Sequence, residues 1–275
     1  MAEPQLPSIK EILEATEILG SQDSTKVVKV GEKFAVKYGA DVSLLEADTM
    51  RYVSANSNTP VPKVFGTITH PDDPNFNYII MEFIGGQRLD AIWPDLSVAE
   101  QEDVKSQLQA AVNSMRLMPN QGYIGSVGRK KCIDGVFYTG NTYDPEVNGP
   151  FATEADMNEG ILRRVAETCP PSTIRLFRTI LSNLPPHQIV FTHAHLQARN
   201  IIVKRTPSDA NGPSRMELSI IDWEMSGWYP EYWEFCNSII FNTFHDEWID
   251  IVQDIMVVYS NEYLLMQKIR NILFW

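Results

Sequence analysis

The chain has 275 residues, of which 44% are hydrophobic and 21% charged, the balance of an ordinary soluble globular protein. Its formal charge of −12 makes nucleic acid or an anionic membrane an unexpected partner. Its cysteines (Cys132, Cys169 and Cys236) have no metal-binding spacing, and the N-terminal region lacks the pattern of a signal peptide. No segment is long and apolar enough to span a bilayer. We therefore expect a soluble, cytoplasmic protein.

The first part of the chain predicts a small sheet with one inserted helix. Ser8 followed by Glu11 is a capping-box pattern that predicts a helix to about Leu19. The β-rich runs KVVKV and KFAVKY predict a hairpin, because a glycine and a glutamate separate them. A second capping-box pattern, Ser43 with Glu46, predicts the helix, and KVFGTIT and NYIIMEF predict two further strands.

The rest of the chain predicts mostly helices. Residues 84–95 hold two glycines and a proline, which is typical of a linker. A helix is expected from Ser97, with apolar positions at helical spacing as far as Met118. Residues 119–152 show no clear periodicity, and a loop of that length in a compact domain is usually functional or mobile. Helical patterns return around residues 154–168, at 174–184 and after 232.

Two apolar, strand-like runs each end in a cluster of polar residues. The run FTHAHLQARNIIV carries His193, His195 and Asn200, and LSIIDWEMSGWYPEYWEF carries Asp222 and Glu224. A carboxylate at the mouth of an apolar strand is costly unless it is paired, hydrogen-bonded or bound to a cation. The polar stretch TPSDANGPSR between the runs predicts a hairpin tip. These two runs mark the candidate functional site.

The two runs resemble the catalytic loop and the metal-binding loop of the aminoglycoside phosphotransferase and choline kinase family. The resemblance implies an α+β, bilobal protein-kinase-like fold. Its N-terminal lobe, residues 1–83, would be a sheet with one inserted helix, and its C-terminal lobe, residues 84–275, would be mostly helical and carry both motifs. Trp223 and the WYPEYWEF segment are typical of fungal members, which suggests a setting in secondary metabolism.

The resemblance also implies a nucleotide site. Lys37, in FAVKYG, resembles the strand lysine that holds the phosphates, and Glu46 resembles the helix glutamate that pairs with it. A solvated strand lysine and a helix-capping glutamate are the simpler alternatives. Residues 81–84 resemble the hinge whose backbone meets adenine, which makes Met81 and Phe83 candidate cofactor-binding residues. Residues 21–25 take the place of the turn that covers the phosphates.

Asn200 and Asp222 resemble the two metal ligands of the family. Amide and carboxylate oxygens suit Mg²⁺. Glu224 is either a further ligand or a helix cap. His193 matches a histidine that is usually structural in the family, and we count it with His195 and Asp222 as a candidate catalytic residue. ATP and Mg²⁺ are therefore the expected cofactors if phosphotransfer is retained, and no cofactor is expected otherwise.

The sequence departs from the family at its decisive position. The family reads His-Gly-Asp, whereas this chain reads His-Ala-His, so that His195 stands where a carboxylate base is expected. Imidazole can act as a general base, but it would become positively charged beside Mg²⁺. Ala194 in place of glycine is expected to remove access to positive φ. The His-x-His pair could also ligate zinc, but no third ligand is identifiable.

Three functions follow from this departure. The sequence narrowly favours a repurposed enzyme that cyclises or isomerises an apolar metabolite in the interlobe cleft, possible reactions including a cycloaddition, with His195 supplying a proton or hydrogen bond. The alternative is an ATP- and Mg²⁺-dependent phosphotransferase acting on a small-molecule hydroxyl, and the third is a non-catalytic pseudokinase. Both enzymes would bind a small-molecule substrate, and the sequence carries no signal of oligomeric state.

Overall fold

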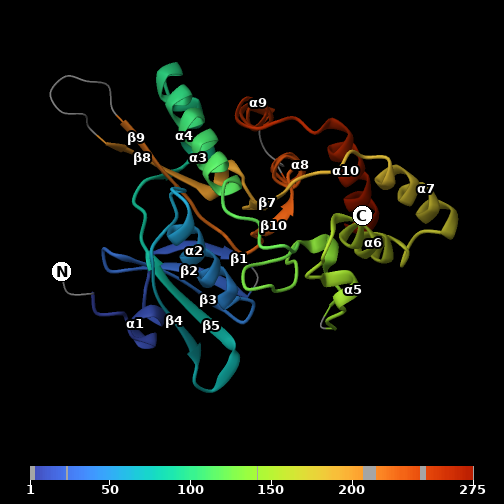
Figure 1. Cartoon of the computed structure of the whole chain (residues 1–275). Helices are drawn as coiled ribbons and strands as arrows, with labels where there is room; N and C mark the ends of the chain where they lie inside the picture. Colours follow the sequence, from blue (N-terminus) through green and yellow to red (C-terminus); the bar gives the residue numbers. More distant parts are fainter. Residues whose placement is uncertain (1–3, 23, 141, 207–214, 242–245, 275) are drawn as a thin grey trace.

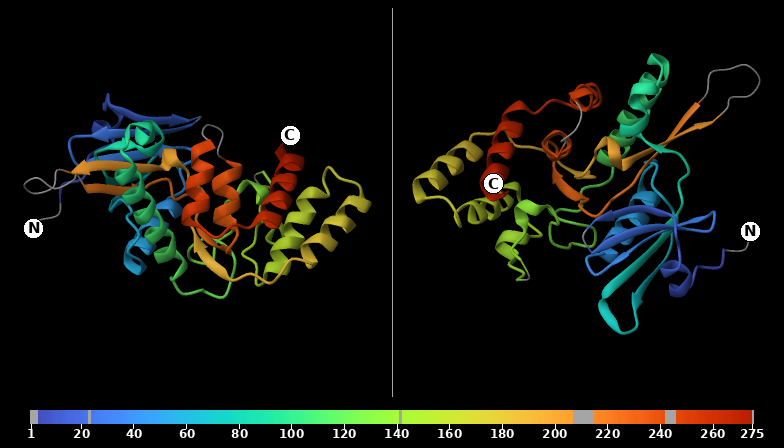
Figure 2. Two further views of the ribbon diagram at one scale, coloured as in Figure 1. Left: turned by 90° about the horizontal axis from the view of Figure 1, so that it is seen from above. Right: turned by 180° about the vertical axis from the view of Figure 1, so that it is seen from behind.

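The expected α+β architecture is confirmed. An antiparallel sheet forms the N-terminal part and helices dominate the C-terminal part (Figure 1). Figure 2 shows that the sheet and the helices α6, α7 and α10 lie toward opposite ends of the molecule. The computed structural model describes residues 4–22, 24–140, 142–206, 215–241 and 246–274.

The N-terminal sheet has five strands in the order β1-β2-β3-β5-β4, and helix α2 packs against β4 and β5. Strand β3 is central and buried along its whole length, which places Lys37 in the interior. The predicted hairpin and the two further strands are confirmed. The elements are α1 (Ile9–Leu13), β1 (Ile18–Gln22), β2 (Thr25–Val30), β3 (Phe34–Gly39), α2 (Leu44–Asn56), β4 (Val64–His70) and β5 (Asp73–Glu82).

The first helix is shorter than predicted. The capping box of Ser8 and Glu11 is present, but α1 ends at Leu13. The chain then continues into β1, where Ile18 pairs with Val28 of β2. Pairing within the hairpin of β1 and β2 has overridden the local helical pattern, as contacts outside a segment often do.

The C-terminal part begins with short elements and continues with longer helices. The predicted linker is partly structured, because β6, α3 and a 3₁₀ turn lie within residues 84–95. Helix α4 begins at the predicted capping box of Ser97 and Glu100. The elements are β6 (Gln87–Arg88), α3 (Leu89–Ile92), η1 (Trp93–Asp95), α4 (Val98–Arg116), η2 (Gly135–Phe137), α5 (Pro145–Asn148), α6 (Glu154–Val165), α7 (Pro171–Ser182), β7 (Ile189–Thr192), η3 (Ala198–Asn200), β8 (Ile201–Thr206), β9 (Arg215–Ile220), β10 (Gly227–Pro230), α8 (Trp233–Ile240), α9 (Asp246–Ile255) and α10 (Ser260–Phe274).

Strand pairing brings the two motif runs together. Strands β8 and β9 form the predicted hairpin, whose tip at residues 207–214 lies outside the described residues. Strand β7 pairs with β10 on the other side of the motifs, Thr192 facing Gly227. The Ile221 N–H donates to the Asn200 carbonyl at 2.9 Å, which ties the loop after β9 to the loop before β8.

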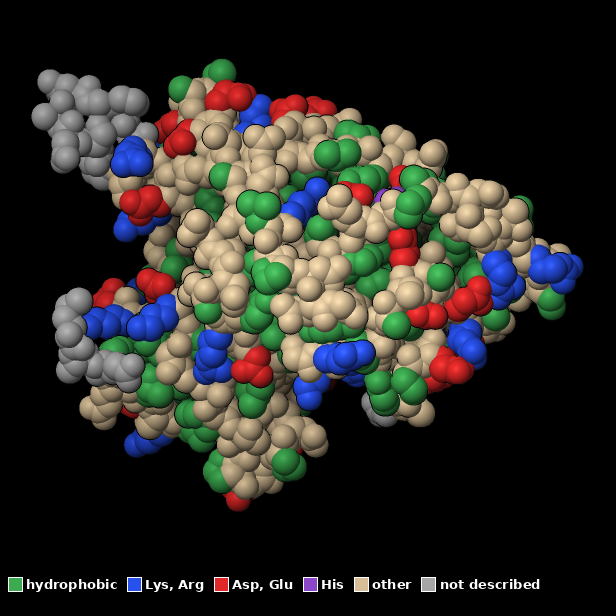
Figure 3. Space-filling view, viewed as in Figure 1, with side chains coloured by type: hydrophobic (Ala, Val, Ile, Leu, Met, Phe, Trp, Pro, Cys, Tyr) green, Lys and Arg blue, Asp and Glu red, His purple; other side chains and the backbone are tan. Residues whose placement is uncertain are grey.

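One large apolar core joins α2 to the C-terminal helices and contains four buried tryptophans. A smaller cluster fills the other face of the N-terminal sheet. The sheet ends at Glu82 and the next strand starts at Gln87, so the division at residue 83 stays a prediction. Figure 3 shows basic and acidic side chains interspersed on the visible face, outside its grey atoms.

Candidate active site

Lys37 is the centre of a cluster of charged side chains from both parts of the chain. Its Nζ lies 2.8 Å from Glu46 Oε2, 3.0 Å from Asp222 Oδ1 and 3.0 Å from Glu224 Oε2. Burial opposes the charged ammonium, but the carboxylates, Glu46 first, hold the pKa of Lys37 well above its usual range. Lys37 is therefore a buried, permanently charged contact between the sheet and the loop after β9, and a solvated strand lysine is excluded.

Glu46 is directed at Lys37 and is not needed to cap its helix. Ser43 caps α2 by accepting a hydrogen bond from the Leu45 N–H, while the Glu46 side chain is buried against the ammonium. Burial raises the pKa of Glu46 to about 7, although the positive charge of Lys37 opposes this shift. Three carboxylates thus surround one ammonium, and the cluster carries excess negative charge.

His193 is fully buried and serves as a structural element. Its Nε2 lies 3.1 Å from the Ile221 carbonyl, and its Nδ1 accepts from the His195 N–H at 3.2 Å. Burial lowers the pKa of His193 to about 3, and the neighbouring His195 adds to this shift. A neutral ring that donates from Nε2 and accepts at Nδ1 satisfies both partners, so His193 pins the two motif loops together.

His195, at the position of the expected base, has both ring nitrogens facing charged groups. Nδ1 lies 3.0 Å from Asp222 Oδ2, without the alignment of a hydrogen bond, and the Arg199 guanidinium lies 3.2 Å from Nε2. Arginine can only donate, so the assigned tautomer accepts at Nε2 and carries its proton on Nδ1. In this conformation neither nitrogen is free to meet an acceptor hydroxyl.

The predicted metal ligands converge, and His195 and Glu224 join them. The Asn200 amide nitrogen donates to the His195 carbonyl at 2.9 Å and reaches Asp222 Oδ2 at 3.5 Å, which leaves the amide oxygen for a cation. Ligand atoms of His195, Asp222 and Glu224 lie within 4.8 Å of one another. Burial alone would raise the pKa of Asp222, but His195 and Lys37 hold it below its usual range. The donor set fits a divalent cation.

The turn between the two histidines is backed by residues of α8. The Glu234 carboxylate accepts from the His193 N–H at 2.6 Å and from the Ala194 N–H at 3.2 Å, and the Asn237 amide donates to the Ala194 carbonyl at 2.9 Å. Ala194 has a φ of 64°, in the left-handed region. The expectation that alanine excludes positive φ here is therefore wrong, because side chains of α8 hydrogen-bond to the backbone of the turn and hold it.

A second buried layer supports Asn237. The Asp134 carboxylate accepts from Asn237 at 2.9 Å, from Trp233 Nε1 at 3.0 Å and from the Arg270 guanidinium at 2.6 Å. Burial would raise the pKa of Asp134, but Arg270 keeps it below its usual range. The irregular segment after α4 and the last helix, α10, therefore both reach the catalytic loop through these contacts.

The predicted adenine hinge is placed at the end of β5, but its backbone is partly used. The Phe83 N–H donates to the Lys33 carbonyl at 2.9 Å, and the Phe83 ring lies 4.6 Å from Lys29 Nζ. Met81 is half-buried within β5. The cofactor-binding role of Met81 and Phe83 stays a prediction. The predicted phosphate-covering turn joins β1 to β2, and its residue 23 lies outside the described residues.

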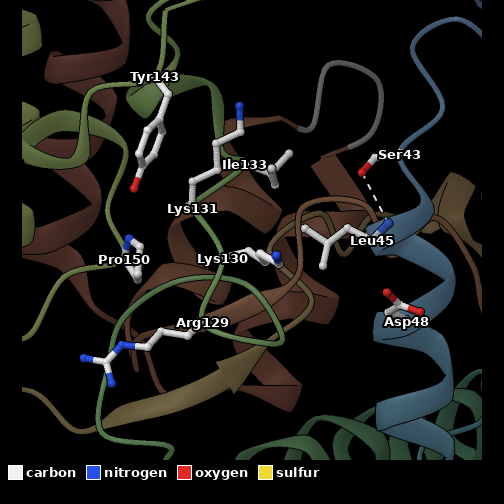
Figure 4. Close-up of a pocket in the computed structure, with 9 residues that line it drawn as sticks. All are labelled: Ser43, Leu45, Asp48, Arg129, Lys130, Lys131, Ile133, Tyr143 and Pro150. Carbon is white, nitrogen blue, oxygen red and sulfur yellow. Dashed lines mark hydrogen bonds between the residues drawn. The ribbon is translucent and has the colours of Figure 1, made fainter. Parts of the chain in front are cut away.

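A cavity of about 480 Å³ lies beside the first turns of α2. Its walls come from the first turns of α2, next to Glu46, and from the segment 119–152 that lacked periodicity (Figure 4). Lys130 extends toward Leu45 and Asp48 of α2, whereas the Arg129 guanidinium turns away from that helix. Basic side chains line part of the cavity, and apolar side chains such as Ile133 and Pro150 line the rest.

The sequence model of the phosphotransferase enzyme family matches residues 18–267. The chain belongs to the phosphotransferase enzyme family. No match is found among curated proteins. These findings make a phosphotransferase-type enzyme the supported class of function, and they give no support to repurposing as a cyclase or isomerase.

Solved structures with this fold include three that are informative. The ADP-bound aminoglycoside phosphotransferase APH(2'')-Ib has a TM-score of 0.59 at 14% identity, covering 95% of this chain and 84% of that one. The streptomycin–ATP complex of APH(2")-IIa has a TM-score of 0.56 at 15% identity, covering 97% of this chain and 88% of that one. A putative fructosamine-3-kinase from Haemophilus somnus has a TM-score of 0.58 at 14% identity, covering 92% of this chain and 80% of that one. At such identities the likeness establishes the fold.

Sequence reasoning found the charged cluster but missed its supports. Arg199 was overlooked, although its place directly before Asn200 puts it on the same loop. Glu234, Asn237 and Arg270 gave no signal, since each lies far along the chain from the residues it contacts. Among the described helices, none is long and apolar enough to cross a membrane.

Proposed function

We propose that this chain is an ATP- and Mg²⁺-dependent phosphotransferase that acts on a hydroxyl group of a small molecule in the cytoplasm. The contact of Lys37 with Glu46 on one side and with Asp222 on the other carries the proposal. A lysine fixed by a helix glutamate can hold nucleotide phosphates, and a neighbouring aspartate can hold the metal that bridges them. Phosphoryl transfer depends mainly on such positioning and charge neutralisation.

The divalent cation would be held by Asp222 and Asn200, with Glu224 in reach. It would neutralise charge that develops on the transferred phosphoryl group. The excess negative charge around Lys37 supports a cation at this place, because one ammonium cannot balance the buried Glu46 together with the partly exposed Asp222 and Glu224. The chain's own residues orient the phosphates and the metal.

In the conformation described, His195 would hold Asp222 and Arg199 in place and would not deprotonate the acceptor hydroxyl, because these two residues face its ring nitrogens. A loose transition state with little bond formation to the nucleophile makes only a small demand on a general base. The replacement of the base is therefore compatible with transfer. The aligned charged cluster is more than a repurposed apolar cleft or a pseudokinase needs, and no contact among the described residues specifically favours either of those functions.

The proposal is tested by ³¹P NMR of ATP incubated with the protein, Mg²⁺ and hydroxylated small molecules. We expect loss of the γ-phosphate signal and appearance of a phosphomonoester with at least one acceptor. Lys37→Ala should abolish the product. Lys10→Ala, which removes an 81%-exposed lysine on α1, should leave it unchanged. Product formed equally by Lys37→Ala would contradict the role given to the cluster.

A further inference from the structure

We propose that His195 is a ligand of the divalent cation and that it shifts the preference of the site from Mg²⁺ toward Mn²⁺. The inference deepens the proposed function and rests on it for the presence of the ion. It assigns a direct metal contact to the residue that replaced the expected base. The substitution would then have changed the coordination of the metal.

The spacing of the donor atoms fits one ion. Nδ1 of His195 lies 3.0 Å from Asp222 Oδ2 but is not aligned for a hydrogen bond. Ligands at about 2.1 Å from an octahedral ion stand about 3.0 Å apart when they occupy adjacent vertices. The pair therefore has the separation of two adjacent ligands, and one ligand atom each of His195, Asp222 and Glu224 lie within 4.8 Å of one another.

Lys37 leaves room for this ion. It contacts Oδ1 of Asp222 and Oε2 of Glu224, whereas His195 approaches the other oxygen of Asp222. The same aspartate can thus pair with the ammonium through one oxygen and bind a cation through the other. A cation beside Oδ2 would also offset the negative charge that one ammonium leaves uncompensated.

The nitrogen ligand determines which ion is favoured. Mg²⁺ is a hard cation that prefers oxygen ligands, and an aspartate at this position would provide only oxygens. Imidazole is a softer ligand, and first-row transition ions gain more from it than Mg²⁺ does. Mn²⁺ accepts the carboxylate and amide oxygens of Mg²⁺ sites, and as a first-row transition ion it gains more from imidazole than Mg²⁺ does, although less than the later ions of that row. A site with His195, Asp222 and Glu224 should therefore favour Mn²⁺ over Mg²⁺.

Ion binding requires a rearrangement of Arg199. With the metal on Nδ1, the single proton of the neutral ring moves to Nε2 by exchange with solvent, and no net proton is released. Nε2–H then faces the Arg199 guanidinium, which must turn away. Within the described ranges Arg199 has no ion pair with a carboxylate, so no such contact opposes the movement. The released guanidinium could then meet a phosphate.

The test is an EPR titration of free Mn²⁺ with the full chain, without nucleotide, followed by competition with Mg²⁺. We expect His195→Ala to weaken Mn²⁺ binding about 10-fold or more and Mg²⁺ binding by less than about 3-fold. His70→Ala removes a half-buried histidine that stacks on Tyr78 in the sheet, and it should change neither affinity. Circular dichroism checks that each variant is folded.

His195→Asp provides the second variant, because it restores an oxygen ligand. It should bind both ions and lower the Mn²⁺ to Mg²⁺ affinity ratio toward that of an all-oxygen site. An equal Mn²⁺ to Mg²⁺ affinity ratio in the wild type, His195→Ala and His195→Asp would overturn the inference. Failure of the wild type to bind Mn²⁺ would also overturn it. A His195-dependent Mn²⁺ preference in a protein that makes no phosphorylated product would uphold the inference and count against the proposed function alone.

Discussion

Asp222 connects Lys37 to His195 through its two carboxylate oxygens, with Oδ1 3.0 Å from the lysine Nζ and Oδ2 3.0 Å from the histidine Nδ1. The proposed phosphate-holding lysine and the residue at the base position therefore share one carboxylate. A substitution of Lys37 therefore changes the charge balance around His195, and a substitution of His195 changes the charge balance around Lys37. This coupling is a reason to test the site through its charges as well as through activity.

Glu46→Ala should destabilise the fold by about 1–3 kcal/mol, which is below the usual cost of breaking a buried ion pair. The cost is reduced because Lys37 keeps its contacts with Asp222 and Glu224. Chemical denaturation measures the effect. Glu14→Ala removes a carboxylate that is 66% exposed and should change the free energy of unfolding by less than about 0.5 kcal/mol. Equal effects of the two substitutions would contradict the buried pair.

Arg270→Met should destabilise the fold by about 3–5 kcal/mol, because it leaves the buried Asp134 carboxylate without its ion-pair partner. Asp134→Asn should have a comparable effect for the converse reason. The double variant should lose clearly less than the sum of the two single losses. A double-mutant cycle by denaturant unfolding measures the coupling, and strict additivity would show that the two side chains do not interact in solution.

Acid should weaken the fold through Asp134. Its pKa lies below the usual range in the folded protein, so its contribution to stability is present above the unfolded pKa of about 3.9. That contribution is lost as the pH falls further, through the folded pKa. Unfolding curves at pH 5 and pH 3 should therefore differ less for Asp134→Asn than for the wild type. An unchanged difference would contradict the lowered pKa.

Ala194→Gly should leave the free energy of unfolding within about 1 kcal/mol of the wild type, because relief at positive φ offsets the loss of a buried methyl group. Ala111→Gly, at a buried position inside α4, should cost at least about 1 kcal/mol, since glycine has no such benefit in a helix. Thermal or denaturant unfolding of both variants makes the comparison. A larger loss at residue 194 would show that the turn is not strained.

Much of the fold followed from local pattern. Turns that contain glycine or proline separate predicted strands of the sheet. Two of the predicted helix starts carry complete capping boxes. The helix predicted to reach Leu19 ends at Leu13 because the residues after it pair with β2 in a hairpin, which the capping box at Ser8 does not report. The turn at Ala194 was misjudged for a different reason, since Glu234 and Asn237 hold it from a distant helix.

The charged cluster was predictable only through resemblance to a family. Lys37 and Asp222 are separated by 185 residues, and nothing local to either requires the other. The pairing of Glu46 with Lys37 could be established only from the packing of α2 on the sheet, because a helix-capping glutamate has the same sequence pattern. The sequence did not reveal that Arg199 lies against His195. Its guanidinium at Nε2 removes the free nitrogen that a general base requires.

The most direct test of the central claim is calorimetric titration of the purified protein with Mg-ATP. The account predicts saturable binding in the micromolar range for the wild type and for Lys10→Ala. Lys37→Ala should lose it, because the three carboxylates around residue 37 would then face the phosphates without the lysine ammonium. Absence of binding by the wild type at millimolar Mg-ATP, or equal binding by Lys37→Ala, would contradict the account.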